Sequence, residues 1–357
     1  MKITYIYHSG FLVESADAYY IFDYYRADFP VTDADKPVYV FVSHRHPDHY
    51  NPYVFEILRE KKVRRMTGII SYDIKPRNYT SHMEGVEIIA AEPDKEYTLD
   101  NGALVRTLRS TDKGVAYVVT FDDGGVPRSV YHAGDLNDWV WEGEDERVNK
   151  WMTGSYRRYL TAVEGMHFDA VMVPVDSRQG DDMFRGIEYL LEKVKADAVY
   201  PMHYWDKPEV IMQFAGKYPQ YADIIRYTED RMDRYSVIED KNPREIVLLR
   251  GSGCVYKKCT FCDYYSDSGK DEDVNYMINR AALSQVTGKY GNIEIINSGS
   301  VFELDKRTIE LIKKRCAECM IHTIHFEAHY LYNNRIEDLR REFADFELKM
   351  KLGLESF

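Results

Sequence analysis

The run Ser43-His44-Arg45-His46-Pro47-Asp48-His49 constrains this chain more than any other feature of its sequence. It directly follows the apolar stretch Val38–Val42, which predicts a buried strand. Histidines two positions apart that leave a strand point the same way, and zinc, manganese and iron accept imidazole and carboxylate ligands. The sequence therefore predicts a metal site at this strand end, with four candidate ligands: His44, His46, Asp48 and His49.

Other polar residues stand at the ends of later predicted strands. Asp135 follows an apolar strand, and Gly134 beside it lets the chain turn tightly. His203 follows a short predicted strand at 198–200. Ahead of the histidine run, the sequence predicts strands at 3–7, 11–14 and 19–23, with His8-Ser9-Gly10 as a tight turn.

The pattern His-x-His-x-Asp-His after a buried strand resembles the signature of the metallo-β-lactamase fold superfamily. The resemblance covers roughly the first 240 residues, and the His8-Ser9-Gly10 opening is similar to that of L-ascorbate-6-phosphate lactonases. It implies an α/β fold, an αββα sandwich, over residues 1–240, with Asp135 as bridging ligand and His203 as the last metal-binding histidine. It also implies one or two zinc or manganese ions and a small-molecule substrate, with Asp48, His49 and Asp135 as catalytic residues.

One position departs from the superfamily pattern. A histidine is expected after the middle strand, but residues 108–114 contain none. Either Asp112 replaces it as a hard oxygen ligand, which favours manganese or iron, or a single ion is held by Asp48, His49, Asp135 and His203. A binding module without catalysis is a further alternative.

If metal is bound, the expected chemistry is hydrolysis by metal-activated water of an ester, lactone or phosphodiester. The first half has no Gly-x-Ser-x-Gly motif and no cysteine before Cys254, which argues against a covalent nucleophile there.

Several other residues permit two interpretations. We expect His8 and Asp23 to line the cleft. The alternative for His8 is that it only forms a hydrogen bond within the turn. His132 lies on an apolar strand and is interpreted as a packed residue or one that supports a ligand. The aromatic stretch from Trp139 to Tyr159 ends in a predicted amphipathic helix at 145–163, for which we favour core packing over capping of the cleft.

All five cysteines lie beyond residue 253, and three of them, Cys254, Cys259 and Cys262, follow the apolar strand predicted at 246–249. Three thiolates on one loop suit an iron-sulfur cluster with one open iron. The motif resembles that of the radical S-adenosylmethionine superfamily, with Phe261 at the aromatic position but four residues in the first gap instead of three. The resemblance implies a 4Fe-4S cluster and S-adenosylmethionine as cofactors. A zinc knuckle is the alternative.

The residues after the cysteines alternate between predicted helices and strands, which indicates parallel βα units over residues 245–357. We expect helices at 273–289, 306–319 and 336–343, and strands at 292–297, 321–328 and 347–352. By resemblance, Ser298 and Gly299 contact the methionine moiety, and Glu327 and Glu355 end strands where ribose is bound. Cys316 and Cys319 are interpreted as structural or incidental. The resemblance implies a (βα) radical S-adenosylmethionine barrel over these residues. The barrel looks incomplete, so we expect a truncated or fused reading frame, or a missing half from another chain.

Composition restricts the setting and the partners. A formal net charge of −12 disfavours generic nucleic-acid binding, and no stretch resembles a signal peptide or a membrane span. Clustered thiols beside an iron-sulfur motif favour the reducing cytoplasm. Three function classes stay open: a metal-dependent hydrolase with an appended radical S-adenosylmethionine segment, a redox enzyme with the first half as partner or scaffold, and a non-catalytic metal-binding protein.

Overall fold

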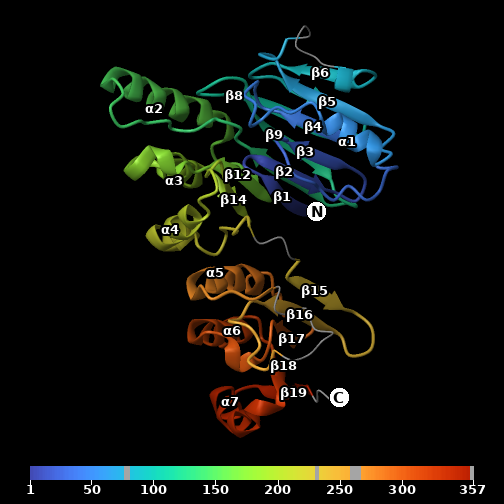
Figure 1. Ribbon diagram of the computed structural model, residues 1–357, viewed down its shortest axis with the longest axis vertical. Coiled ribbons are helices and arrows are strands. Elements are labelled where there is room, and N and C mark those ends of the chain that lie inside the picture. The colour runs from blue at the N-terminus through green and yellow to red at the C-terminus, as the bar shows by residue number, and fades with distance from the viewer. Residues whose placement is uncertain (76–80, 230–232, 258–266, 354–357) are drawn as a thin grey trace. The chain divides into compact units, whose positions relative to one another are not determined.

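The computed structural model describes residues 1–357 except 76–80, 230–232, 258–266 and 354–357 (Figure 1). It contains two compact units, Met1–Phe214 and Ala215–Phe357, and the division falls within helix α4 (Glu209–Lys217). The functional boundary between residues 240 and 245 stays a prediction. No helix among the described residues has both the length and the apolar character needed to cross a membrane.

Two six-stranded sheets form the first unit. The first sheet follows chain order, with β1–β3 antiparallel and β3–β6 parallel. Its strands are β1 (Lys2–Tyr7), β2 (Gly10–Glu14), β3 (Tyr19–Phe22), β4 (Val38–Val42), β5 (Met66–Ser71) and β6 (Glu87–Ala91). The second sheet has the order β14-β12-β10-β9-β8-β7. Its strands are β7 (Glu96–Thr98), β8 (Leu104–Arg109), β9 (Val115–Asp122), β10 (Pro127–His132), β12 (Ala170–Pro174) and β14 (Val199–Met202). The short strands β11 (His167–Phe168) and β13 (Lys195–Ala196) pair separately.

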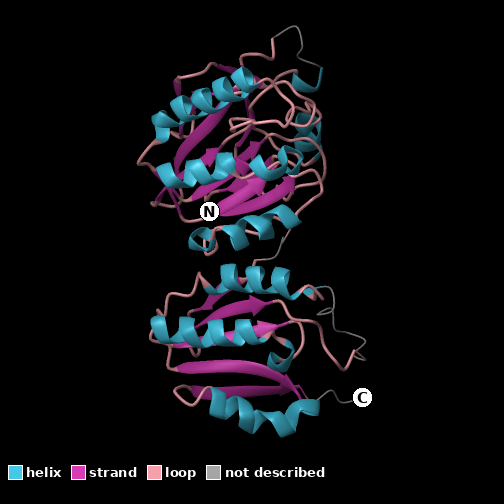
Figure 2. Ribbon diagram, turned by 90° about the vertical axis from the view of Figure 1, so that its left-hand side faces the viewer, coloured by secondary structure: helices cyan, strands magenta, loops and turns pink. Residues whose placement is uncertain are grey.

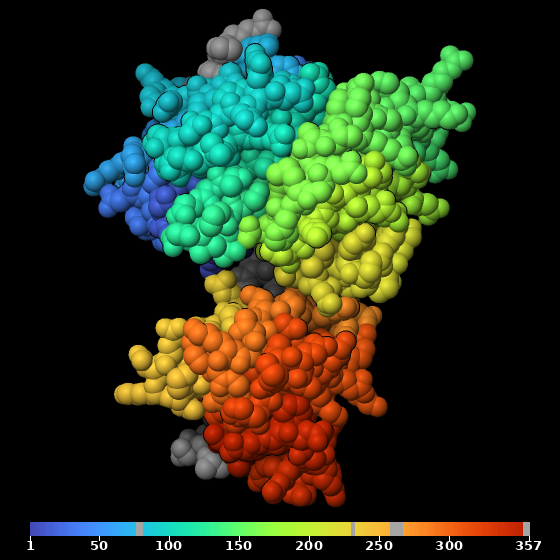
Figure 3. All heavy atoms as spheres, turned by 180° about the vertical axis from the view of Figure 1, so that it is seen from behind, coloured from blue at the N-terminus to red at the C-terminus, as the bar shows by residue number. Residues whose placement is uncertain are grey.

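Helices cover the outer faces of the two sheets, as Figure 1 shows. Helix α1 (Val54–Glu60) packs its buried side chains Val54, Phe55 and Leu58 against β3 and β4 of the first sheet. Helices α2 (Glu146–Leu160) and α3 (Arg185–Lys193) lie on the second sheet. The segment containing α2 projects from the surface of the first unit in the space-filling view (Figure 3). These layers confirm the expected αββα sandwich.

Aromatic side chains join the two sheets. Phe22 stacks on Phe41 at 4.7 Å between ring centroids, and Phe41 meets Tyr117 of the second sheet edge-on at 5.1 Å. The buried Tyr117 hydroxyl donates hydrogen bonds to the carbonyl oxygens of Val42 (2.8 Å) and Ile69 (3.1 Å). Since Val42 is the last residue of β4, these contacts hold the start of the histidine run against the second sheet.

The second unit contains a five-stranded sheet in the order β15-β16-β17-β18-β19, and its helices lie along the sheet (Figure 2). The antiparallel edge strand is β15 (Tyr235–Ile238), and the parallel strands are β16 (Arg244–Leu249), β17 (Asn292–Asn297), β18 (Thr323–His329) and β19 (Glu347–Gly353). The helices are α5 (Glu272–Leu283), α6 (Lys306–Glu318) and α7 (Ile336–Glu342). The alternation of strands and helices expected after residue 245 is therefore present.

Two buried groups in this unit have pKa values shifted from their ordinary values. The Glu245 carboxylate accepts hydrogen bonds from the Tyr235 hydroxyl (2.6 Å) and from the backbone amides of Thr287 (2.7 Å) and Gly288 (2.8 Å). Burial alone would raise its pKa, but these bonds hold the pKa of Glu245 below its ordinary value. Cys316 is fully buried in the core, and this burial raises the pKa of its thiol to about 12.

Candidate metal centre

The loop that carries the histidine run is held by two close backbone approaches. Gly114 has φ +74°, and a side chain there would overlap the carbonyl oxygen of Ser43. Gly134 has φ +50°, and a Cβ atom there would lie 2.5 Å from the Cβ of Ser43. The backbone amide of Val115 donates to the Ser43 carbonyl at 2.9 Å. Glycine is thus required at both positions, and the loops before β9 and after β10 reach the start of the histidine run.

His44, His46, Asp112 and Asp135 form the first group of candidate ligands, with all four ligand atoms within 4.8 Å of one another. The Nε2 atom of His44 lies 2.9 Å from Nδ1 of His46. The same Nδ1 atom lies 3.4 Å from a carboxylate oxygen of Asp112. The structure thus brings Asp112 to the position where the absent histidine was expected.

The second group consists of His8, Asp48, His49 and His203. The Oδ2 atom of Asp48 lies 3.3 Å from Nε2 of His8 and 3.9 Å from Nε2 of both His49 and His203. His8 and His203 have positive backbone φ angles, 59° and 65°. This conformation is unusual for residues other than glycine and is enriched at functional sites.

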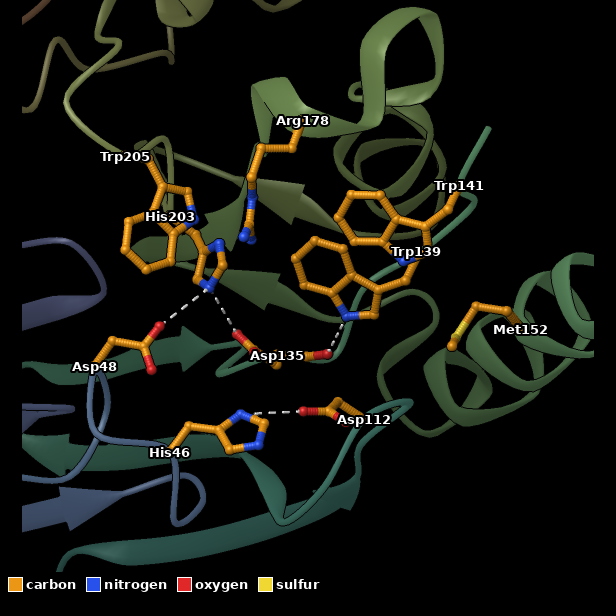
Figure 4. A pocket seen from close by; sticks show the side chains of 10 residues that line it. All are labelled: His46, Asp48, Asp112, Asp135, Trp139, Trp141, Met152, Arg178, His203 and Trp205. Carbon is orange, nitrogen blue, oxygen red and sulfur yellow. Dashed lines mark hydrogen bonds and ion pairs between the residues drawn. The ribbon is translucent and has the colours of Figure 1, made fainter. Parts of the chain in front are cut away.

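Asp135 faces both groups with its two carboxylate oxygens. Its Oδ2 atom lies 3.5 Å from Nε2 of His44 in the first group. Its Oδ1 atom lies 3.3 Å from Nε2 of His49 and 3.5 Å from Nε2 of His203 in the second group. Figure 4 shows His203 directed at both Asp48 and Asp135. Asp135 therefore has the geometry of a bridging ligand.

The other ring nitrogen of three histidines is hydrogen-bonded to a residue outside the two groups. Nδ1 of His49 lies 2.7 Å from the buried carboxylate of Asp23, and Nδ1 of His203 lies 3.1 Å from that of Asp176. Nδ1 of His44 lies 3.0 Å from the Ser43 hydroxyl. These partners orient the rings with Nε2 toward the site and favour the tautomer in which Nε2 is free to bind a metal.

The electrostatics of the cluster suit a cation. Burial lowers the pKa of His44 to about 4, whereas the carboxylates of Asp135 and Asp23 outweigh burial at His49 and raise its pKa to about 9. His8 Nε2, His49 Nε2 and Asp135 Oδ1 are buried and accept or donate no hydrogen bond among the described residues, although each faces an oppositely charged or ionisable group at 3.3 Å. Buried polar atoms normally form hydrogen bonds, so three ligand atoms without one in the same cluster fit a bound divalent ion.

A pocket of about 330 Å³ opens over these residues. Its floor contains His46, Asp48, Asp112, Asp135 and His203, and Figure 4 shows the other lining residues around them. These are Trp139, Trp141, Met152, Arg178 and Trp205. The pocket is large enough for a small molecule at the lower end of the usual ligand-site range.

The structure brings together all seven residues predicted as metal ligands: His44, His46, Asp48, His49, Asp112, Asp135 and His203. Their role as ligands stays a prediction. Sequence reasoning left His8 ambiguous, and it overlooked Asp176, Arg178 and Trp205. His132 is fully buried, with its Nε2 atom 2.8 Å from the carbonyl oxygen of Ser9, which fits the packed role, one of the two that we expected.

The aromatic stretch divides between core and pocket. Tyr156 of α2 is buried and donates to the Gly186 carbonyl at 2.7 Å, which fits the expected core packing. Trp139 and Trp141 instead line the pocket, as does Met152 of α2. Helical periodicity could not reveal this, since both tryptophans precede the helix.

In the second unit, the loop after β16 meets the loop after β17. The Gly251 amide donates to the Ser298 hydroxyl at 3.1 Å, and a side chain at Gly299 would lie 3.1 Å from the backbone of Cys254. Glu327 lies on β18 and is partly buried. Cys259, Phe261, Cys262 and Glu355 lie outside the described residues.

Comparisons with known proteins agree with the fold of the first unit. A family model described as a beta-lactamase superfamily domain matches residues 2–146. The match covers less than half of the chain and, together with the two facing sheets, agrees with a metallo-β-lactamase fold in the first unit. A search of curated proteins found no match.

Solved structures with detectable similarity include a metallo hydrolase from the archaeon Ignicoccus hospitalis, which is 19% identical over 63% of this chain and 93% of that chain, with a TM-score of 0.41. An isothiocyanate hydrolase from Delia radicum gut bacteria is 15% identical over 63% of this chain and 95% of that chain, with a TM-score of 0.37. A queuine lyase from Clostridium spiroforme, described as bound to SAM and queuine, is 48% identical over 35% of this chain, with a TM-score of 0.34. The chain covers 54% of that lyase, about half of its length.

Proposed function

We propose that the first unit is a metal-dependent hydrolase that acts on an ester, a lactone or a phosphodiester of a small molecule. The observation that carries this proposal is the position of Asp135 between two groups of ligand-type side chains at the floor of a pocket. A lactone is the substrate type suggested by the similarity of the His8-Ser9-Gly10 opening to L-ascorbate-6-phosphate lactonases.

The residues of the two groups would hold one or two zinc or manganese ions. His44, His46 and Asp112 would hold one ion, and Asp48, His49 and His203 the other, with Asp135 shared. A divalent ion of this kind supplies an activated water and a Lewis acid for the scissile group. His8 is close enough to Asp48 to bind the second ion or to orient the carboxylate.

The chain's own residues have three further tasks in this proposal. Asp23 and Asp176 keep the proton of His49 and His203 on Nδ1, away from the site. The backbone carbonyl of Asp135 accepts a hydrogen bond from the indole of Trp139 at 2.9 Å, which anchors the pocket wall to the bridging residue. The three tryptophans line two sides of the pocket with apolar surface that excludes water, and this strengthens electrostatic interactions inside it.

Elemental analysis of variants in the full-length chain tests the ligand assignment. The double variant His49→Ala/His203→Ala should lose most of its zinc or manganese, because both residues face Asp135. His167→Ala is the matched control, since His167 is an exposed histidine of the same unit that pairs with Asp197 at 2.9 Å. An unchanged metal content in the double variant would contradict the proposed centre. Release of product from ester, lactone and phosphodiester substrates, and its loss in the double variant, tests hydrolysis.

The proposal that Asp112 replaces the expected histidine as a metal ligand has its own test. Because imidazole is a better zinc ligand than carboxylate, Asp112→His should raise zinc affinity, whereas Asp112→Ala should lower the occupancy of one position. If neither change alters metal binding, Asp112 is not a ligand and the single-ion alternative is favoured.

We propose a second activity for the second unit, an iron-sulfur centre that binds S-adenosylmethionine. The contact between the Cys254 loop and the loop of Ser298 and Gly299 supports it, since these loops would hold the cluster and the methionine moiety. Anaerobic reconstitution of the full chain should give iron and labile sulfide that depend on Cys254, Cys259 and Cys262 but not on Cys319. Tight zinc without iron uptake would instead indicate a zinc knuckle.

A further inference from the structure

Arg178 is the one permanent cation among the ten described residues that line the pocket. We propose that it binds an oxyanion of the substrate, a carboxylate or a phosphate, while the flat ring that carries this group lies against Trp139 and Trp141. The proposal rests on the hydrolase function and deepens it, because it names the substrate class: an anionic ester or lactone with an aromatic or similarly flat ring.

The guanidinium of Arg178 is held in one orientation with one edge free. Its Nε atom donates to both carboxylate oxygens of Asp176, at 2.9 and 3.0 Å, and its Nη2 atom donates to Oδ2. Asp176 is fully buried. Its pairing with Nε and Nη2 leaves the outer edge of the Arg178 guanidinium with no hydrogen bond among the described residues. The remaining N–H groups of Nη1 and Nη2 have the geometry that suits an oxyanion.

Aromatic rings flank the guanidinium of Arg178. Its central carbon lies 4.9 Å from the ring centroid of Trp205 and 5.8 Å from that of Trp141. Figure 4 shows Arg178 reaching into the pocket between Trp205 on one side and the pair Trp139 and Trp141 on the other. A cation preorganised in this way loses little side-chain entropy when it binds an anion.

Trp139 and Trp141 form an aromatic wall of the pocket. Their rings are stacked with centroids 5.8 Å apart and an interplanar angle of 1°. The Trp139 indole N–H already donates to the Asp135 carbonyl, so its polar atom does not need a partner in the ligand. A ring is the group that such a wall packs against best.

The charges in the pocket also set the direction of the substrate. The carboxylates of Asp48, Asp112 and Asp135 are at the floor, and Arg178 enters from another side, as Figure 4 shows. Arg178 therefore attracts an anionic substituent to its own side of the pocket, and the scissile bond lies over the candidate ligands.

A purely structural role for Arg178 is the alternative, in which it only neutralises Asp176 and so keeps His203 in place. The two roles differ in what they predict. A structural role changes metal content and affects charged and neutral ligands alike, whereas recognition affects only the anionic ligand.

Two probe molecules separate the roles. The tryptophan fluorescence of the full chain, incubated with zinc, is titrated with benzenesulfonate and with methyl phenyl sulfone, a neutral molecule of nearly the same shape. Sulfonate is a weak zinc ligand, so a preference for it reports a cation of the protein. We expect benzenesulfonate to bind about tenfold more tightly than the sulfone, because a hydrogen-bonded pair of opposite charges contributes about this factor to affinity.

The Arg178→Gln variant should reduce this preference to about one, and Trp141→Leu should weaken both probes by a similar factor. Arg109→Gln is the matched control: Arg109 is equally exposed, pairs with Asp94 at 3.3 Å and does not line the pocket, so its variant should keep the preference. A preference that survives in Arg178→Gln, or that is absent in the parent chain, would overturn the inference.

Zinc content measured in the same samples keeps the two proposals distinguishable. If the chain holds no zinc but the preference depends on Arg178, the recognition site stands and the hydrolase proposal fails. If zinc is bound and benzenesulfonate has no advantage over the sulfone, the hydrolase proposal stands and the inference about Arg178 fails.

Discussion

Replacing Asp23 by Asn should weaken metal binding while the first unit stays folded. Asp23 is 1% exposed, and its carboxylate accepts hydrogen bonds from the amide of Ser43 (2.7 Å), the hydroxyl of Ser43 (2.6 Å) and Nδ1 of His49 (2.7 Å). Asparagine keeps the volume and one acceptor oxygen, but its NH₂ group cannot accept from His49. The proton of His49 then moves to Nε2, the atom that faces Asp135, and a protonated Nε2 cannot bind a metal.

The expected size follows from these contacts. Loss of a group that orients a metal-binding histidine lowers affinity about 10- to 100-fold. Two of the three hydrogen bonds to a charged, buried acceptor are lost, which costs about 3 kcal/mol in the free energy of unfolding. Zinc affinity is measured by competition with a chromogenic chelator, and stability by denaturant unfolding of the zinc-free chain.

Asp169→Asn is the matched control for this prediction. Asp169 likewise accepts from a backbone amide, that of Ser129 at 2.7 Å, and from Arg128 at 2.6 Å, but it belongs to neither ligand group. Its variant should lose stability without losing zinc affinity. A folded Asp23→Asn variant that binds zinc as tightly as the parent would refute the argument that Asp23 sets the tautomer of a ligating His49.

Three other perturbations have expected outcomes. Gly114→Ala should lower the free energy of unfolding by about 2 kcal/mol or more, because the added methyl group meets the carbonyl of Ser43 at a positive φ angle. Gly143→Ala, also at positive φ but in open space, should cost about 1 kcal/mol in the same denaturant titration. Since the pKa of Glu245 is lowered in the folded state, its carboxylate stabilises the second unit above its ordinary pKa of 4.5, and this contribution is lost as the pH falls through the folded-state value. Acid titration followed by circular dichroism should therefore show a smaller loss of stability below about pH 4.5 in Glu245→Gln than in the parent, although the variant is less stable at neutral pH. Burial and a thiol pKa of about 12 should make Cys316 the slowest described cysteine to be alkylated in the native chain, as peptide mapping by mass spectrometry would detect.

Much of the architecture could be predicted because strands and helices depend on local periodicity. The strand predicted at 292–297 coincides with β17 (Asn292–Asn297), and the helix predicted at 145–163 corresponds to α2 (Glu146–Leu160) with a short 3-10 turn, Thr161–Val163. A metal site at the histidine run could also be predicted, since four ligand-type residues lie within six consecutive positions. Asp135 and His203 could be added because each follows a strand end.

His8 and Asp176 could not be assigned in the same way. Each is a single polar residue, and neither belongs to a motif in which a second ligand-type residue stands at a characteristic spacing. Their importance arises from the sheet order, which brings the turn after β1 and the end of β12 to the loop of His203. The carbonyl of His8 accepts a hydrogen bond from the amide of His203 at 3.2 Å, a contact between two sheets that no local pattern encodes.

The pocket wall was misjudged for a related reason. Amphipathic periodicity correctly indicated that Tyr156 is buried, but Trp139 and Trp141 lie in the irregular segment before α2. In such a segment, a large aromatic residue has no preferred face, and only the neighbouring loops decide whether it packs in the core or lines a cavity. Here the bond from Trp139 to the carbonyl of Asp135 turns it to the pocket.

The candidate ligands come from both sheets, and this couples metal binding to the sandwich itself. His8 and the histidine run follow strands of the first sheet, β1 and β4, whereas Asp135 and His203 follow β10 and β14 of the second. An ion shared by these residues would join the two sheets at one edge, so part of its binding free energy would be free energy of folding. The same edge already depends on the bonds of Tyr117 to Val42 and Ile69, which hold the sheets at the correct spacing without metal. The metal-free sandwich is therefore preorganised for the ion, with buried ligand atoms that form no hydrogen bond among the described residues and whose desolvation cost is relieved when a cation binds.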